Sequence, residues 1–512
     1  MKRSSKQGTF DRIIAGLAST FLYQIIAAAH SLLLVPLFLR AWGTDGYGNW
    51  LVLTAFVSYL GLLDLGGQNY IGNLLAFDHA QGDEIGFRRR FSEALSLFSL
   101  ISIASFLLLI AALSLPSFPL PGRDISLSGA ERGVLLFVGG ASLVLIPQGV
   151  FVTVYRATGK LYTGTMVGNG MRFLSLLLYA GVLLAGGSPV LYAFTYFLAA
   201  VLLTLVVVWH GCRTIPQCSG IRFSFAAARE GKRYLGGALF FWIYALAAAI
   251  NLQGVIIVLG AFAAPTAVAL YATHRTASGL LGYVGNLFMA SVWPDFSFAH
   301  AGGEKEKLAR MAILTVRAVV FLSAVAAVAL WILLPEIYPL WTAKKLGLQP
   351  WLMALFLAQG VLASGWSTAG WVLLASNEHR TLAWWALANA GLTVTMAVLL
   401  APNYGVFGVA AATLLGDLVC GALVYPRMAA RHLGISASQM FRAIFRPVLA
   451  VVPAGVLVLL CSTLKAPVWT RVFVGAVVAA ALLYPSALLA FGRSDWSMLT
   501  GRLRHIATGV GT

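Results

Sequence analysis

Residues 265–292 read PTAVALYATHRTASGLLGYVGNLFMASV, an apolar run interrupted near its middle by His274 and Arg275. A helix of about 20 apolar residues spans the hydrocarbon core of a bilayer, so this run predicts a transmembrane helix. A charged side chain at the centre of such a helix costs about 2.5–3.5 kcal/mol on insertion scales. The stretch therefore predicts a helical membrane protein, and it identifies Arg275 as a charge whose cost must be offset by a structural or functional role.

The whole chain has the composition of an integral membrane protein. Of its 512 residues, 60% are hydrophobic and 10% are charged, and the mean hydropathy is +0.85. Apolar runs long enough to cross a bilayer recur about fourteen times. They lie near residues 13–39, 47–77, 93–115, 133–155, 164–186, 188–209, 236–260, 265–292, 311–334, 350–375, 382–400, 404–425, 447–463 and 470–491. These runs predict an all-α integral membrane protein with about 14 transmembrane helices.

The positive charge is unevenly distributed between alternate loops. The formal net charge is +18, and most Lys and Arg residues fall in loops on one predicted side of the membrane. By the positive-inside rule this side is cytoplasmic, and so are both termini. Basic loops that face anionic lipid account for most of the net charge, so we expect membrane lipids as partners and no nucleic acid.

The cysteines do not predict a disulfide framework. His210, Cys212 and Cys218 form a cluster with zinc-binding side chains, but no fourth ligand lies nearby. We therefore expect no metal and no other cofactor.

Aromatic residues gather at predicted outer boundaries of the spans. We expect these side chains to anchor the helices in the lipid interface: Trp42, Tyr47, Trp50, Trp331, Tyr338, Trp341 and Trp351.

The two halves of the chain are weakly similar. The segment that begins at Ala157 resembles the one that begins at Ala375, 218 positions later. Six spans per half is an even number, so the halves enter the membrane from the same side, which predicts a parallel pseudo-twofold repeat. We expect an N-terminal six-helix lobe (1–212), a cytoplasmic linker (213–235), a C-terminal six-helix lobe (236–430), and helices 13 and 14 with a cytoplasmic tail (431–512). A substrate site is expected between the lobes.

Arg275 heads a stripe of polar and small residues. At about 100° per residue, Tyr271, Ser278 and Asn286 lie within about 60° of it. Roughly ten residues, or about 15 Å, separate Arg275 from the predicted outer end of its span, which is too far for easy snorkelling. The equivalent residues 54–59 of the first half carry no charge. This asymmetry favours a functional role over an architectural one.

Charges and polar groups within other spans complete the predicted site. The substrate-binding candidates are Arg275, Arg172, Arg317, His274, Tyr271, Asn286, Gln68, Asn251 and Gln253. The candidates for coupling to H⁺ or Na⁺ are Asp64 and Asp417. Structural alternatives remain open: Asp64 as a cap within LLDLGG, Asp417 as the partner of a neighbouring helix, and Arg317 as a snorkelling cation.

Three stretches carry a resemblance to a known family. GTDGYGNW (43–50) followed by YLGLLDLGG (59–67), RATGK (156–160), and NYGVFGVAAATLLGDLV (403–419) resemble the Wzx-type polysaccharide flippases of the multidrug/oligosaccharidyl-lipid/polysaccharide superfamily. These proteins act in O-antigen and exopolysaccharide synthesis. The resemblance covers nearly the whole chain.

The resemblance implies two six-helix lobes and alternating access. It implies transport of an undecaprenyl-pyrophosphate-linked oligosaccharide from the cytoplasmic to the periplasmic leaflet of the bacterial inner membrane. Glycan polymerase and glycosyltransferase partners are implied as well. Related lipid II flippases carry an arginine in the eighth span, where Arg275 stands, and a lipid-tail groove formed by spans 13 and 14, which residues 447–491 resemble.

Two other functions remain open at this point. An ion-coupled multidrug exporter of the same superfamily would need carboxylates that line the cavity. A polysaccharide polymerase or ligase would need a large periplasmic loop with catalytic groups, and neither segment 116–132 nor segment 335–349 has clustered acids and bases. We therefore expect a transporter and not an enzyme.

Overall fold

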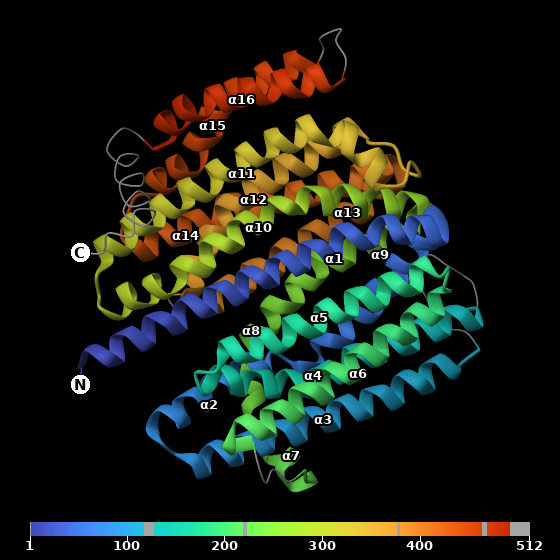
Figure 1. Cartoon of the computed structure of the whole chain (residues 1–512), viewed down its shortest axis with the longest axis vertical. Helices are drawn as coiled ribbons and strands as arrows, with labels where there is room; N and C mark the ends of the chain where they lie inside the picture. Colours follow the sequence, from blue (N-terminus) through green and yellow to red (C-terminus); the bar gives the residue numbers. More distant parts are fainter. Residues whose placement is uncertain (1, 117–126, 219–222, 376–378, 463–467, 492–512) are drawn as a thin grey trace. The chain divides into compact units, whose positions relative to one another are not determined.

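The computed structural model describes residues 2–116, 127–218, 223–375, 379–462 and 468–491, and their regular secondary structure is helical (Figure 1). The first helices are α1 (Lys2–Ser58), α2 (Gly67–Gln81), α3 (Glu84–Ser114), α4 (Gly129–Ala157), α5 (Leu161–Leu184), α6 (Pro189–Thr214), α7 (Phe225–Gly231), α8 (Leu235–Ala249) and α9 (Val255–Phe262). The others are α10 (Pro265–Ala301), α11 (Lys305–Trp341), α12 (Pro350–Ala375), α13 (His379–Gly416), α14 (Leu423–Leu433), α15 (Ala437–Ser462) and α16 (Val468–Phe491).

Short irregular helices interrupt several of the long ones. Three are 3-10 helices: η1 (Tyr59–Asp64), η2 (Pro216–Cys218) and η3 (Lys232–Tyr234). Two are π-helices: η4 (Ile250–Gly254) and η5 (Asp417–Ala422).

The membrane-spanning helices agree with the predicted number. Eleven stretches of the described residues are long and apolar enough to cross a membrane, and two of them, Ala18–Gln81 and Arg380–Leu433, have 64 and 54 residues. Each of these two contains a glycine outside the helical conformation, Gly43 with φ 72° and Gly405 with φ 52°. Counting each as two spans and adding the 37-residue α10 gives fourteen. The prediction of an all-α membrane protein is confirmed.

Helix ends follow from local side chains. Ser128 and Glu131 form a capping box that begins α4. Ser188 caps α6, with Pro189 in the first turn, where a missing N–H costs nothing. These signals fix where two spans begin.

Packing divides the chain into two compact units. Unit 1 comprises residues 1–272 and 386–412, and unit 2 comprises residues 273–385 and 413–512. The divisions fall within α10 and α13. These units are not the predicted lobes, whose boundaries and pseudo-twofold relation stay predictions.

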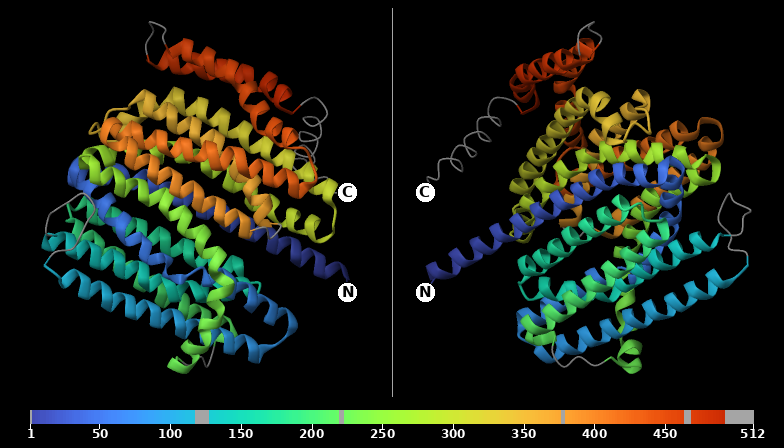
Figure 2. Two further views of the ribbon diagram at one scale, coloured as in Figure 1. Left: turned by 180° about the vertical axis from the view of Figure 1, so that it is seen from behind. Right: turned by 45° about the vertical axis from the view of Figure 1, so that its right-hand side comes forward.

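In unit 1, helices α3, α4 and α6 lie side by side (Figure 1). Together with α2 they bury one apolar core that includes Phe91, Phe98, Leu143 and Val154. In unit 2, α11 packs against α12, α15 and α16, and the two C-terminal helices lie together, in red in Figure 2.

The expected lipid anchors near Gly43 are instead packed inside unit 1. Tyr47 and Trp50 are buried; the ring of Trp50 stacks on Phe38 and meets Tyr192 edge to face, and Phe38 and Tyr192 are tilted against each other. The Nε1 atom of Trp42 donates to the carbonyl of Gly187 at 2.8 Å. The interfacial assignment was wrong for Tyr47 and Trp50, because the aromatic cluster gives these rings a buried environment, and it stays a prediction for the half-buried Trp42.

Among the expected anchors of unit 2, Tyr338 is fully buried, whereas Trp351 is 80% exposed. Lipid anchoring therefore stays a prediction for Trp351 and is wrong for Tyr338.

Candidate functional site

The second span is broken at Asp64. The 3-10 helix η1 ends there, and Leu65 and Gly66 follow with positive φ angles of 50° and 70°. The Oδ1 atom of Asp64 accepts a hydrogen bond from the N–H of Gly66 at 3.1 Å. The carboxylate thus caps the break within its own loop, the structural alternative considered for LLDLGG, while ion coupling through Asp64 stays a prediction.

This break is docked closely onto α8. The indole Nε1 of Trp242 donates to the carbonyl of Leu62 at 3.0 Å. A Cβ placed on Gly66 would lie 2.6 Å from the backbone N of Trp242 and 2.7 Å from the carbonyl O of Ala238. Only glycine satisfies both the left-handed conformation and this contact between backbones.

We expect Gly66→Ala to destabilise the protein by about 2–5 kcal/mol, because overpacking against rigid backbone adds to the strain of a positive φ angle. Thermal unfolding in detergent would measure the loss. Gly61→Ala is the matched control, since no described atom lies within 4 Å of a Cβ at that position. Equal melting temperatures for the two variants would show that the break is not held in this way.

The seventh span is also irregular where it carries polar groups. Asn251 and Gln253 lie in the π-helix η4, between α8 and α9, and both are half-buried. The hydroxyl of Tyr59 lies 3.5 Å from the carbonyl O of Ala249, just before η4. Single-turn π segments and broken helices are common at functional sites of transporters, because they leave backbone groups available. Unit 1 thus contains two irregular helices, and Tyr59 of η1 contacts the last residue of α8, directly before η4.

Two other predicted residues of unit 1 have partners within it. The Nε2 atom of Gln68 lies 3.4 Å from the carbonyl O of Ile146 on α4. The guanidinium carbon of Arg172 lies 4.4 Å from the centre of the Tyr23 ring. The exposed Arg172 therefore has a cation–π partner on the first span that the sequence did not reveal.

His274 is fully buried and uses both ring nitrogens within unit 2. Its Nε2 accepts from the backbone N–H of Gln349 at 3.0 Å, and its Nδ1 lies 2.9 Å from the hydroxyl of Tyr338. Because Nε2 accepts, the proton of the neutral ring is on Nδ1, which donates to Tyr338. The Tyr338 hydroxyl can then donate to Thr273, 2.7 Å away. These contacts favour a positioning role for His274, next to Arg275, over direct contact with a substrate.

The contacts of His274 fix the level of this part of α10 relative to α11 and α12. Gln349 directly precedes α12, and Tyr338 lies in the last turn of α11. His274 therefore lies beside the turn that joins α11 to α12 and not beside the middle of these two helices. Arg275 itself lies ten residues after Pro265, where α10 begins, and its depth in a membrane stays a prediction.

The remaining candidates are placed as follows. Arg275 itself is half-buried, as are Arg317 on α11 and Asn286 on α10, whereas Tyr271 is fully buried. Burial makes Tyr271 inaccessible to a substrate in this conformation.

Asp417 begins the second π-helix, η5, and connects it to α12. Its Oδ2 accepts a hydrogen bond from the Nε2 of Gln359 at 2.8 Å. Both residues belong to unit 2. This contact is the structural alternative predicted for Asp417, and a coupling role for it stays a prediction.

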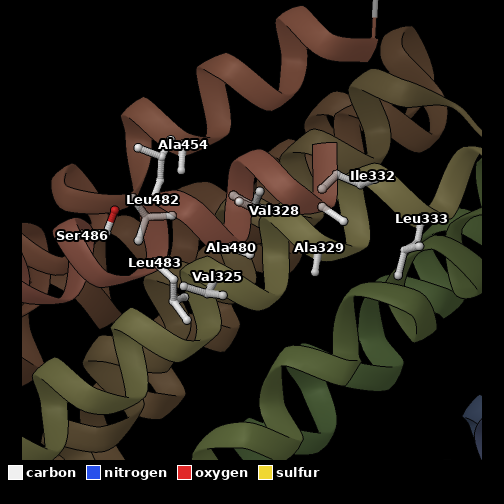
Figure 3. Close-up of a pocket in the computed structure, with 13 residues that line it drawn as sticks. Val325, Val328, Ala329, Ile332, Leu333, Ala454, Ala480, Leu482, Leu483 and Ser486 are labelled. Carbon is white, nitrogen blue, oxygen red and sulfur yellow. The ribbon is translucent and has the colours of Figure 1, made fainter. Parts of the chain in front are cut away.

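Unit 2 also contains two apolar cavities beside α15. One, of about 310 Å³, is lined by α11, α15 and α16, with Val325, Val328, Ala454 and Leu483 among its residues (Figure 3). The other, of about 790 Å³, is lined by α11, α12 and α15, with Trp331, Trp351, Ala358 and Val452 among its residues. We call this second cavity the α12–α15 groove. Its lining offers nothing for a charged ligand and suits an aliphatic chain.

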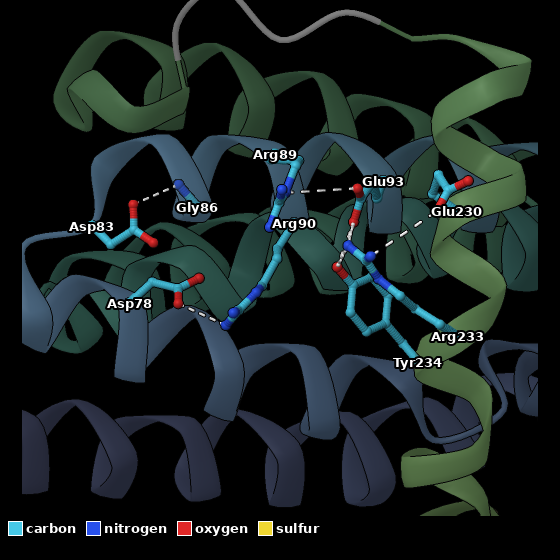
Figure 4. A network of polar contacts seen from close by, with 9 residues as sticks. All are labelled: Asp78, Asp83, Gly86, Arg89, Arg90, Glu93, Glu230, Arg233 and Tyr234. Atoms are coloured by element: carbon cyan, nitrogen blue, oxygen red, sulfur yellow. Dashed lines mark hydrogen bonds and ion pairs between the residues drawn. The ribbon is translucent and has the colours of Figure 1, made fainter.

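One polar network in unit 1 was missed entirely from the sequence (Figure 4). Glu93 on α3 is only 5% exposed, and it lies 2.6 Å from the guanidinium of Arg233, on η3. The hydroxyl of Tyr234 donates to the same carboxylate oxygen. Nearby, Asp78 is buried and lies 2.6 Å from Arg90. The only local signal was the Arg89 and Glu93 pair, four residues apart.

The cluster considered for zinc forms other contacts. His210 Nδ1 lies 2.8 Å from the hydroxyl of Tyr155, and the thiol of Cys212 lies 3.8 Å from the carbonyl O of Cys218. Within the described residues, no group of three or more His, Cys, Asp and Glu side chains is placed to hold a metal ion. Burial, with a smaller contribution from Cys212, raises the pKa of Cys218 to about 12.

These two thiols are expected to differ in reactivity. Cys212 is exposed and Cys218 is buried. At pH 8 a thiol with a pKa near 12 is a thiolate in about one molecule in 10,000, so a maleimide should label Cys212 and leave Cys218 unlabelled. The measurement uses single-cysteine variants in inverted and right-side-out vesicles with an impermeant reagent. The predicted topology requires labelling of Cys212 only in inverted vesicles, and labelling only from the other side would reverse the orientation.

Comparisons with solved structures agree on the fold. The chain is similar to the lipid II flippase MurJ in an inward closed conformation, with a TM-score of 0.69, 13% identity, and 93% of this chain and 99% of that chain covered. It is also similar to an inward-facing multidrug resistance MATE family transporter of the MOP superfamily, with a TM-score of 0.60, 15% identity, and 79% and 99% covered. A third similar structure is the MATE multidrug transporter DinF-BH, with a TM-score of 0.58, 15% identity, and 84% of this chain and 95% of that chain covered. No protein-family model and no curated protein matches the sequence.

Proposed function

We propose that this protein is a flippase and not an enzyme, and that it moves an undecaprenyl-pyrophosphate-linked oligosaccharide from the cytoplasmic to the periplasmic leaflet of a bacterial inner membrane. The observation that carries the proposal is the α12–α15 groove, an apolar cavity of about 790 Å³ in the same unit as Arg275 and Arg317. A polyprenyl pyrophosphate has an aliphatic tail and a doubly charged headgroup. The groove suits the tail, and arginine suits the headgroup, because its planar fork binds phosphate with two parallel hydrogen bonds.

The extent of the structural similarity also supports a lipid-linked substrate. The superposition on the lipid II flippase includes 93% of this chain, whereas those on the two MATE transporters include 79% and 84%. We take this wider coverage as support for a flippase over a drug exporter. The substrate of the flippase is a property of that protein, and for this chain the oligosaccharide class rests on the sequence resemblance.

Export of a cationic drug is the second candidate, because two of the similar structures are multidrug transporters. The two functions separate in one experiment with purified protein in proteoliposomes. A flippase exposes a fluorescent undecaprenyl-pyrophosphate oligosaccharide to an impermeant glycosidase on the opposite side. An exporter instead accumulates a cationic dye and leaves the lipid-linked sugar in place. Dye transport without lipid translocation would overturn the proposal.

The same vesicles test the coupling ion. If Asp417 or Asp64 binds a proton or Na⁺ during transport, an imposed gradient of that ion accelerates translocation. A rate that is unchanged by both gradients would remove these two carboxylates from the coupling role.

A further inference from the structure

The connector before the seventh span exposes two aromatic rings. Phe223 is 51% exposed and Phe225 is 71% exposed, and their ring centres are 6.1 Å apart. Phe225 begins α7, a helix of 7 residues that belongs to unit 1. Exposed large apolar side chains that lie together mark a surface that binds a protein, a membrane or an apolar ligand.

The opposite face of α7 is fixed to α3, so these rings cannot turn inward. Ala228 and Gly231 are buried, and a Cβ on Gly231 would lie 2.7 Å from the carbonyl O of Glu93. The N–H of Ser224 lies 3.3 Å from the Oγ of Ser96. The Glu93 network with Arg233 and Tyr234 holds the other end of the connector (Figure 4). Arg233 is exposed whereas the carboxylate of Glu93 is buried, so this contact ties the end of the connector to α3.

The position of α7 along α3 places it at the edge of the predicted membrane. Glu93 and Ser96 lie 9 and 12 residues after Glu84, the start of α3, and the apolar run of this span begins near residue 93. Figure 1 shows α7 on the flank of unit 1 beside α3. An amphipathic segment at this level lies in the headgroup region, where aromatic side chains insert among the first acyl carbons.

The charges of the described parts of segment 209–232 are mostly positive. Arg229 and Lys232 are exposed, and Arg213 lies with its guanidinium carbon 4.5 Å from the centre of the exposed Trp209 ring. The one acidic residue in the described parts of segment 209–232 is Glu230, which lies 4.0 Å from Arg233. Basic residues near a membrane strengthen its binding when the lipid is anionic.

We propose that α7 and its flanking residues form an interfacial docking surface for anionic phospholipid, in which Phe223 and Phe225 insert between acyl chains while Arg229 and Lys232 contact headgroup phosphates. We call Phe223, Phe225, Arg229 and Lys232 the connector patch. The positive charge of the patch is complementary to anionic headgroups, and its two aromatic rings suit the acyl chains, so a lipid surface is the ligand that fits it. The proposal is independent of the transported substrate.

The test uses the full-length protein in nanodiscs, with native cysteines replaced by serine and an environment-sensitive NBD fluorophore on Phe225→Cys. Discs contain phosphatidylcholine alone or with phosphatidylglycerol, and spin-labelled lipid serves as the quencher. We expect blue-shifted emission and stronger quenching in the discs with phosphatidylglycerol. Arg229→Glu with Lys232→Glu should remove this dependence, with at least about a fivefold loss of the membrane-inserted population, the factor that corresponds to 1 kcal/mol.

Two controls make the result specific. Glu84→Cys carries the label on the exposed first turn of α3, where the emission should stay water-like in both lipids. Lys305→Glu with Lys307→Glu makes the same charge change on exposed residues of α11 and should leave the signal from position 225 unchanged. Phe223→Cys provides a second labelling site if Phe225→Cys folds poorly. Water-like emission at both sites, or equal quenching in the two lipids, would overturn the proposal.

Discussion

Arg275→Ala is expected to lower the rate of lipid-linked oligosaccharide translocation by about 100-fold while leaving folding and membrane insertion intact. A hydrogen bond to a charged group contributes about 1.5–3 kcal/mol, and a bidentate contact with phosphate provides two of them. The side chain of Arg275 is half-buried, and on the same helix His274 is held by Tyr338 and by the backbone of Gln349. Removal of the guanidinium therefore leaves the helix in place.

Arg275→Lys separates charge from geometry. A lysine ammonium keeps the positive charge but cannot form the planar fork, so we expect a loss intermediate between wild type and alanine. Arg442→Ala is the matched control, because Arg442 is exposed in the same unit and contacts Ser438, one turn away on α15. Translocation would be measured in proteoliposomes at equal amounts of folded protein. Wild-type rates for a stable Arg275→Ala protein would remove Arg275 from the site.

The second large effect is expected from filling the α12–α15 groove. Ala358 is exposed on α12 and lines this cavity, so a tryptophan there can be accommodated without repacking of the core. A lipid tail that enters the groove from the bilayer leaves apolar surroundings, so its binding depends on close van der Waals contacts and not on release of water. A ring that fills the groove removes these contacts. We expect Ala358→Trp to reduce translocation by about tenfold, which corresponds to about 1.4 kcal/mol, and Ala358→Leu to reduce it less.

Ala481→Trp controls for the added ring. Ala481 is exposed on α16, in the same unit, and lines neither apolar cavity. It should translocate at the wild-type rate. The prediction also separates substrates, because a cationic dye needs no site for an aliphatic tail. If Ala358→Trp translocates the lipid-linked oligosaccharide normally, the groove does not hold the tail.

The sequence was sufficient for the fold class, because membrane spans are determined by local composition. Fourteen apolar runs predicted fourteen spans, including the pairs that are joined at Gly43 and Gly405. Prediction from the sequence fails where the burial of a side chain is determined by contacts with a distant segment. Tyr47 and Trp50 read as lipid anchors, but Phe38 stacks on both rings and Tyr192 of α6 meets Trp50 edge to face.

The candidate site was predicted less completely for the same reason. Charges within apolar runs identified Asp64, Arg275 and Asp417, yet nothing local indicated their partners. Glu93 was missed because Arg233 and Tyr234, whose hydrogen bonds stabilise its buried carboxylate, lie 140 and 141 positions away in the sequence. The π-helices at Asn251 and Asp417 could not be predicted either, since periodicity alone does not distinguish a π segment from an α-helix.

The central claim, that a lipid-linked oligosaccharide is the substrate, is tested most directly by the sidedness of that lipid in cells. The gene would be deleted, and membrane lipids would be analysed in inverted and right-side-out vesicles with an impermeant glycosidase. We predict that an undecaprenyl-pyrophosphate oligosaccharide accumulates and is cleaved only in inverted vesicles, and that wild-type protein reverses this while Arg275→Ala does not. Unchanged lipid-linked sugars, together with new sensitivity to cationic drugs, would contradict the account.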